Sequence, residues 1–210
     1  MDAPALTTQA TRKNSGMMPQ RIITLRYVVG MVMFFSLQAC SNLPRVILLH
    51  DPLSPDEHVS LAASYKSQGL NEIAAKELEA ALRKQGNHVP ALVTLGNLSF
   101  ERGSLIEAEA YYRQALAVAP NHAGANNNLA MVYLSENRLS EAEWLARKAL
   151  EENSPLKPYA LETLVQIYTR QQRYREAKVA LEEAEVLAPS TKRVLRDSLT
   201  QSRRNLSSLE

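Results

Sequence analysis

The feature that most constrains this chain is a repeat with a period of 34 residues. Leu61, Leu95 and Leu129 share one column of the repeat, and Leu164 joins it after a step of 35 residues. Two columns of alanine follow the same period: Ala74, Ala108, Ala142 and Ala177, and then Ala81, Ala115, Ala149 and Ala184. Periodicity of this length predicts stacked supersecondary units that bury their apolar faces against one another.

Each unit has the pattern of two amphipathic helices. In the second unit, Leu92, Leu95 and Phe100 supply one apolar face, and the pattern restarts at Ile106 after Gly103. Three residues that tolerate a left-handed turn stand at the same place between the helices: Gly69, Gly103 and Asn137. The predicted units are residues 55–88, 89–122, 123–157 and 158–191. Residues 192–210, with Val194, Leu195, Leu199 and Leu206 as an apolar stripe, are expected to add a capping helix.

These columns resemble the tetratricopeptide repeat (TPR). In the second unit the resemblance lies in Leu95, Gly96, Ala108, Tyr112, Ala115 and Pro120, and in the third in Tyr133, Ala142, Ala149 and Pro155. It implies an all-α, right-handed α-solenoid of about four helical hairpins with a C-terminal capping helix. Asn126 stands where the family often has an aromatic residue, and Ala146 where it prefers a bulky one. We therefore expect the core to be thinner there.

The charge balance argues against a nucleic-acid-binding protein. The chain of 210 residues has a formal net charge of +2. Residues 1–39 carry +3, so the remainder carries −1 and lacks the basic stripe that nucleic acids require. With apolar residues at 45% and charged residues at 22%, the chain can form a packed core.

The N-terminal segment is typical of an export signal. Arg21 and Arg26 precede an apolar run over residues 27–37, which is shorter than the roughly 20 residues of a transmembrane helix. Residues 1–39 are thus predicted to be a signal peptide. Because residues 1–16 are polar, Met17 or Met18 is the expected initiator.

The single cysteine follows this signal directly. Leu37, Gln38, Ala39 and Cys40 resemble a bacterial lipobox, which implies that Cys40 is lipidated and becomes the first residue of the mature chain. Residues 40–54 are then a lipidated N-terminus and tether. In the lipoprotein family a serine such as Ser41 is compatible with transfer to the outer membrane. We expect a lipid-anchored protein on the periplasmic face of that membrane, with the inner membrane as the less favoured place.

The sequence contains little that predicts catalysis. His88 and His122 lie 34 residues apart in equivalent loops, too far apart on neighbouring helical layers to share a zinc ion. Carboxylate pairs such as Glu107 with Glu109, or Glu141 with Glu143, fit solvated helix faces. Neither a nucleophile elbow nor a phosphate-binding glycine loop occurs in the sequence. We predict a protein that is not an enzyme and uses no cofactor or metal.

The TPR resemblance implies that ligands bind in a concave groove lined by the first helices of the repeats. The side chains expected there are Asn97, Phe100, Glu101, Asn127, Asn128, Met131, Leu134, Glu162, Gln166 and Arg170. An asparagine offers both a donor and an acceptor to the main chain of an extended peptide. The alternative for the run 126–128 is that one asparagine caps the helix while the others are merely exposed.

The predicted function is a scaffold or adaptor that binds another envelope protein, or an extended peptide, through this groove and supports assembly, secretion or processing. A narrower alternative is an assembly factor similar to the type IV pilus pilotins, although those carry about six repeats. Alternatives of another class are an envelope hydrolase and a structural protein that self-associates through Leu195, Leu199 and Leu206. The sequence leaves the oligomeric state open.

Overall fold

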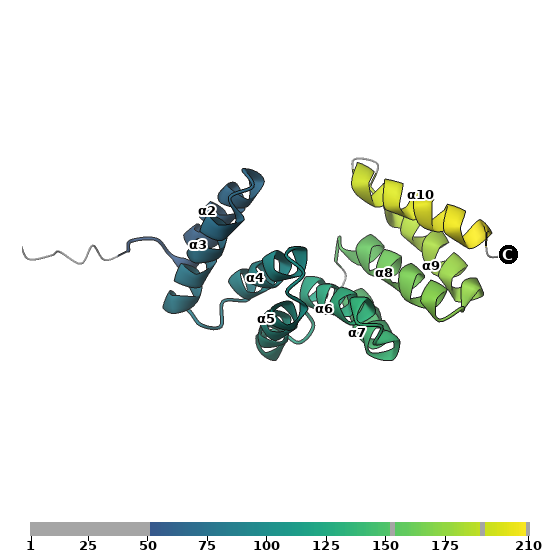
Figure 1. The fold of residues 1–210 in the computed structure, drawn as a ribbon, viewed down its shortest axis with the longest axis horizontal. Helices are drawn as coiled ribbons and strands as arrows, with labels where there is room; N and C mark the ends of the chain where they lie inside the picture. The colour runs from purple at the N-terminus through teal and green to yellow at the C-terminus, as the bar shows by residue number, and fades with distance from the viewer. Residues whose placement is uncertain (1–50, 152–153, 190–191, 209–210) are drawn as a thin grey trace, which may run out of the picture. The chain divides into compact units, whose positions relative to one another are not determined.

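A computed structural model describes residues 51–151, 154–189 and 192–208, and every regular element in those ranges is a helix (Figure 1). In chain order they are α2 (Pro55–Ser67), α3 (Asn71–Lys84), α4 (Val89–Glu101), α5 (Leu105–Val118), α6 (Ala123–Ser135), α7 (Leu139–Glu151), α8 (Lys157–Arg170), α9 (Tyr174–Leu187) and α10 (Arg193–Ser207). The predicted all-α class is confirmed.

Consecutive helices pair as four hairpins: α2 with α3, α4 with α5, α6 with α7, and α8 with α9. The turns within the hairpins have positive φ at Gly69 (76°), Gly103 (79°) and Asn137 (60°), as their residue types predict. In the fourth hairpin Gln172 takes this conformation with φ 61°. The turn geometry thus recurs even where the residue type does not favour it.

The hairpins stack in an ordered way. Each first helix contacts the first helix of the next hairpin, and each second helix contacts the first helix that follows it. Within the described residues the second helices do not contact one another. We call α2, α4, α6 and α8 the inner row and α3, α5, α7 and α9 the outer row. This arrangement is the predicted α-solenoid.

The last helix, α10, packs on both α8 and α9, as the first helix of a further repeat would (Figure 1). Its three core residues, Leu195, Leu199 and Leu206, are all buried. They close the end of the stack, so the self-association alternative that relied on them is wrong. Val194, by contrast, points away from the core and is 85% exposed.

Small residues allow the helices to approach closely. Alanines of both columns are buried throughout, for example Ala108 and Ala115 in α5. Gly96 of α4 faces the ring of the buried Tyr112, and a Cβ added to Gly96 would lie 2.5 Å from the Tyr112 Cε1 atom. Only glycine fits this contact, because real Cβ atoms do not approach other atoms so closely.

Charged side chains join the third repeat to the second. Tyr133 of α6 donates its hydroxyl to Glu109 of α5 at 2.8 Å. Arg113 also pairs with Glu109 (3.0 Å), and the Arg138 guanidinium stacks over the Tyr133 ring at 3.6 Å. Glu109 is only 20% exposed. The interpretation of this glutamate as part of a solvated face is therefore wrong, because it is held at the junction of two repeats.

The same junction recurs between the third and fourth repeats, one period later. Glu143 of α7 accepts hydrogen bonds from Arg147 (3.0 Å) and Arg173 (2.5 Å). The guanidinium groups of Arg147 and Arg173 both lie over the Tyr168 ring. Burial alone would raise the pKa of Glu143, but the hydrogen bonds from Arg173, Arg147 and Gln171 lower it below its ordinary value. Glu143 is thus ionised and structural.

The N-terminal predictions lie largely outside the described residues. These are the signal peptide over residues 1–39, the lipidation of Cys40, and the tether up to residue 50. The last tether residues are described: Ser54 and Glu57 form a capping box at the start of α2, and Lys84 donates to the carbonyl of Leu53. Among the helices in the described part of the chain, none is long and apolar enough to cross a membrane.

Candidate functional site

The inner row brings two of the predicted asparagines together. Asn128 of α6 donates from Nδ2 to Oδ1 of Asn97 in α4 at 2.7 Å. The same oxygen accepts the Tyr112 hydroxyl at 2.8 Å. Burial raises the pKa of Tyr112, so this hydroxyl is protonated and donates at neutral pH. Asn97 and Asn128 therefore form a polar bridge between the second and third repeats.

Asn127 is the least satisfied polar residue of the inner row. Its side chain is 7% exposed, and its Oδ1 atom is buried without a hydrogen-bond partner. The Nδ2 atom makes only long contacts, at 3.5 Å to Asn128 Oδ1 and 3.9 Å to Met131 Sδ. A buried amide oxygen without a donor costs free energy, which a main-chain N–H from a ligand would recover.

Other predicted groove residues are engaged between helices. Glu101 of α4 pairs with Lys66 of α2 at 2.6 Å. Arg170 of α8 donates to the main-chain carbonyl of Leu134 at 2.6 Å, close to the end of α6 where a cation is favourable. These contacts reach across one repeat each, and they help to fix the register of the inner row.

At the C-terminal end of the inner row, α10 reaches the predicted groove. Glu162 accepts a hydrogen bond from Ser198 of α10 at 2.5 Å and another from Gln166 at 2.8 Å. Gln166 is exposed. Phe100 and Leu134 pack into the hydrophobic core, with Leu134 buried and Phe100 half-buried. Of the other predicted groove residues, Asn128 and Met131 are half-buried and Asn127 is buried beside them.

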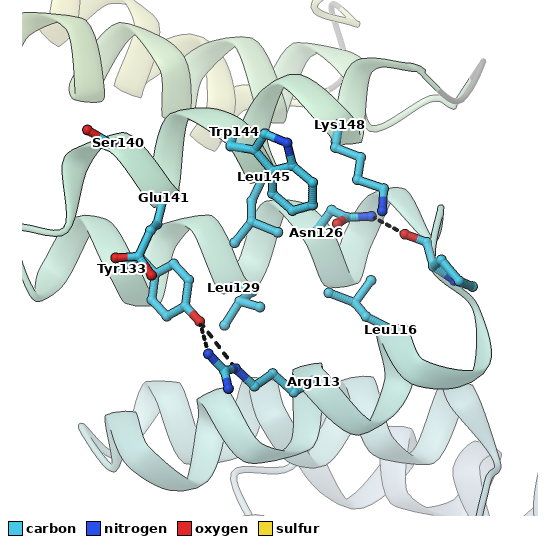
Figure 2. Close-up of a pocket in the computed structure, with 11 residues that line it drawn as sticks. Arg113, Leu116, Asn126, Leu129, Tyr133, Ser140, Glu141, Trp144, Leu145 and Lys148 are labelled. Carbon is cyan, nitrogen blue, oxygen red and sulfur yellow. Dashed lines mark hydrogen bonds between the residues drawn. The ribbon is translucent and has the colours of Figure 1, made fainter.

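The sequence analysis missed a pocket between the two rows, formed by α5, α6 and α7 (Figure 2). It has a volume of about 480 Å³. Apolar and polar side chains share its lining: Arg113, Leu116, Pro120, Asn126, Leu129, Tyr133, Ser140, Glu141, Trp144, Leu145 and Lys148. A volume of this size is typical of pockets that receive a small molecule or a protruding side chain.

Trp144 forms one wall of this pocket, and Figure 2 shows its ring above the leucines of the floor. The ring is 62% exposed, which is unusual for so large an apolar side chain. The Lys148 ammonium lies 5.1 Å from the ring centroid, within cation–π range. No carboxylate in the described part of the chain pairs with Lys148.

Asn126 lies at the back of the pocket and is fully buried. Its Nδ2 donates to the carbonyls of Pro120 (3.1 Å) and His122 (3.2 Å), which fixes the orientation of the amide. Its Oδ1 has no partner. Asn126 therefore neither caps the helix nor is exposed. The N-cap of α6 is His122, whose Nδ1 accepts a hydrogen bond from the Ala125 N–H at 3.0 Å.

The polar side of the pocket is already neutralised. Arg113 donates to the Tyr133 hydroxyl at 2.9 Å and pairs with Glu109. Glu141 accepts from Arg138 at 2.5 Å, and this hydrogen bond lowers the pKa of Glu141. Among the described residues, Lys148 is therefore the charged lining side chain without a carboxylate partner.

A second, smaller pocket of about 360 Å³ lies one repeat later, between α7, α8 and α9. Each of its lining residues follows a lining residue of the first pocket by 34 or 35 positions. The second pocket has Leu161 for Asn126, Val179 for Trp144 and Glu183 for Lys148. It also has Arg175 for Ser140 and Ala180 for Leu145. The pocket geometry thus comes from the repeat, whereas the combination of a buried amide, a tryptophan and a lysine is particular to the first pocket.

His88 and His122 lie at a junction between repeats and at a helix end. His88 lies 2.9 Å through Nε2 from Asp56 of the first repeat, and His122 caps α6. Among the described residues, no three histidine, cysteine, aspartate or glutamate side chains gather closely enough to hold a metal ion.

The family model of the tetratricopeptide repeat matches residues 60–113 and 93–160. The chain is also 36% identical, over 110 residues, to the uncharacterized protein ycf37 of Pyropia yezoensis. That match covers 48% of this chain and 62% of the relative, so the chain spans less than two thirds of its length.

Solved structures share the fold at low sequence identity. The crystal structure of the APC/C hetero-tetramer Cut9–Hcn1 aligns with a TM-score of 0.61 at 16% identity, over 71% of this chain and 30% of that one. A crystal structure of MamA aligns with a TM-score of 0.55, also at 16% identity, over 70% of this chain and 93% of that one. Residues 60–160 thus match the tetratricopeptide repeat model, and the solved structures share the fold of the stacked hairpins.

Proposed function

We propose that this chain is a non-catalytic scaffold that holds a partner protein by an extended segment lying along the inner row. The observation that carries the proposal is the buried, unpartnered Oδ1 of Asn127 beside the bridge between Asn97 and Asn128. A main-chain N–H of a bound peptide would supply the missing donor. Nearby Met131 is half-buried and unbranched, so it can adapt to side chains of different shape.

We further propose that the scaffold is attached by a lipid on Cys40 to the periplasmic face of a bacterial outer membrane. The support is the order of charges, apolar run and cysteine in residues 21–40, followed by Ser41. Residues 41–54 could extend at most about 50 Å between the lipid and the first repeat. The partner would then be an envelope protein that is held near the membrane during assembly, secretion or processing.

The test of the inner row is site-specific photo-crosslinking in cells, with the crosslinker at the exposed Gln166. Asn127→Ala should reduce the crosslinked partner about tenfold, because it removes the acceptor. It should spare the fold, because Asn127 makes only long contacts within the chain. The matched control is Gln114→Ala at an exposed site of α5 in the outer row. Equal crosslinking in Asn127→Ala and wild type would contradict the proposal.

The lipid anchor has its own test. Mass spectrometry of the mature N-terminus should find an acylated Cys40, and Cys40→Ser should release the chain from the membrane fraction. An unmodified Cys40 in a membrane-free fraction would overturn the anchor while leaving the inner-row proposal intact.

A further inference from the structure

We propose that the pocket between α5 and α7 is a second binding site, which takes an apolar side chain of a partner segment together with an adjacent carboxylate. This site lies on a different face from the proposed inner-row site. It does not depend on ligand binding along the inner row.

The pocket has the apolar surface needed to hold a side chain. Leu116, Leu129 and Leu145 form its floor, and the Trp144 ring rises beside them (Figure 2). Because the Trp144 ring is largely exposed, covering it with another apolar group would remove a large apolar area from water. An aromatic or leucine side chain fits this surface.

The pocket also presents one acceptor that the protein does not satisfy. The Asn126 amide nitrogen donates to two main-chain carbonyls, and Oδ1 is the amide atom left without a partner. This oxygen is fully buried. Buried acceptors are almost always paired, so an N–H from the ligand would complete the site. A peptide carries such an N–H on every residue except proline.

The charge of Lys148 further restricts which partner segment can bind. Lys148 borders the pocket and has no carboxylate partner in the described residues, whereas Arg113 and Glu141 are paired within the chain. A carboxylate next to the inserted side chain would therefore meet a cation that is already held against Trp144. Residues 1–39 of this chain carry a net +3 and are disfavoured as the occupant. The favoured occupant is an acidic segment of another protein.

The second pocket has the same position in the repeat but different side chains at the places that carry the proposal. There the acceptor is replaced by Leu161, the tryptophan by Val179 and the cation by Glu183. A repeat solenoid produces such hollows from its packing alone. Within the described residues, the first pocket differs in having a buried amide oxygen without a partner and a lysine against an exposed tryptophan, whereas the cation lining the second pocket without a carboxylate partner is Arg175, at another place.

The experiment uses the intrinsic fluorescence of Trp144, which is the only tryptophan of the chain. Full-length protein is titrated with three blocked hexapeptides: acetyl-Glu-Asp-Phe-Leu-Glu-Asp-amide, the same peptide with lysine at its acidic positions, and the same peptide with serine in place of Phe and Leu. The first should shift the emission to shorter wavelength as the ring leaves water. The other two should bind at least about tenfold more weakly.

Variants then assign the binding to the pocket. Lys148→Glu should weaken the acidic peptide at least about tenfold, since it replaces an attraction by a repulsion. The matched control Lys76→Glu makes the same charge change at an exposed site of α3 and should leave binding within about twofold. Asn126→Leu, which installs the residue of the second pocket, should weaken binding about tenfold, with folding checked by circular dichroism.

Four results would overturn the proposal: no emission change with the acidic peptide, equal binding of the lysine peptide, equal weakening by Lys76→Glu, or an emission shift that follows protein concentration without peptide. The last result would show that a second copy of the chain occupies the pocket.

Discussion

Asn128 donates to Asn97 at 2.7 Å, and this hydrogen bond joins the first helices of the second and third repeats. Because Asn97 Oδ1 also accepts from the buried Tyr112 hydroxyl, it satisfies donors from two further helices at once. Tandem repeats depend on such interfaces, since no hairpin is stable alone. The pair is therefore part of the fold as well as of the predicted groove.

The first prediction concerns this bridge. Asn128→Ala should lower the free energy of unfolding by about 1 kcal/mol, and Asn97→Ala by about 2 kcal/mol because the buried Tyr112 hydroxyl also loses its acceptor. Urea denaturation followed by circular dichroism measures both. The double variant should cost less than the two single losses added together, because both remove the same bond. Strict additivity would show that the two side chains do not interact.

The second prediction concerns the contact between Gly96 and Tyr112. Gly96→Ala should destabilise the protein by about 2–3 kcal/mol, because the new methyl group would overlap a buried ring. The ring cannot easily move aside, since its hydroxyl is bonded to Asn97. Thermal or urea unfolding gives the value. In Gly86→Ala, the control, the nearest atom is 3.8 Å from the new Cβ, and the change should stay within about 1 kcal/mol.

The repeat and its hairpins could be predicted because helix formation and stacking depend on columns of residue types. Gly69, Gly103 and Asn137 marked three turns in advance, since each residue type favours positive φ. Gln172 gave no such signal, because tertiary packing imposes its conformation.

The candidate sites were harder to predict, because they depend on contacts between distant positions. The inner-row list named Asn97 and Asn128 but not their bond, which spans 31 residues. The first pocket was not predicted, although two sequence signals pointed to it. Asn126 occupies a place where an aromatic residue is expected, and Trp144 stands where neighbouring repeats have Ala110 and Val179. Whether such an unusual residue lines the groove or a pocket depends on how the hairpins stack, which the repeat columns do not show.

The third prediction concerns pH. The arginine hydrogen bonds hold the pKa of Glu143 below its ordinary value, so its unfolded-state pKa is the higher one. Its contribution is then complete above the unfolded pKa of about 4.3 and is lost as the pH falls through the lower, folded pKa. Glu143→Gln should cost about 2 kcal/mol at pH 7. That loss should shrink as the pH falls below about 4, where the wild-type carboxylate also becomes protonated.

The control for this pH effect is Glu79→Gln, at an exposed site of α3. It should change the stability by less than about 0.5 kcal/mol at either pH. Urea denaturation at pH 7 and at pH 3.5 makes the comparison. A Glu143→Gln loss that is the same at both pH values would show that the ionised form has no special role.

The fourth prediction concerns the turn of the fourth hairpin. Gln172 has φ 61°, a conformation that strains a residue with a side chain but not glycine. Gln172→Gly should therefore stabilise the protein by about 0.5–1 kcal/mol, despite the greater chain entropy of glycine when unfolded. The matched control is Gln68→Gly at a φ of −92°, where no strain is relieved and a loss of about 0.5–1 kcal/mol is expected. Thermal unfolding measures the stability of both variants. If Gln172→Gly lowered the stability as much as Gln68→Gly, the turn would store no strain.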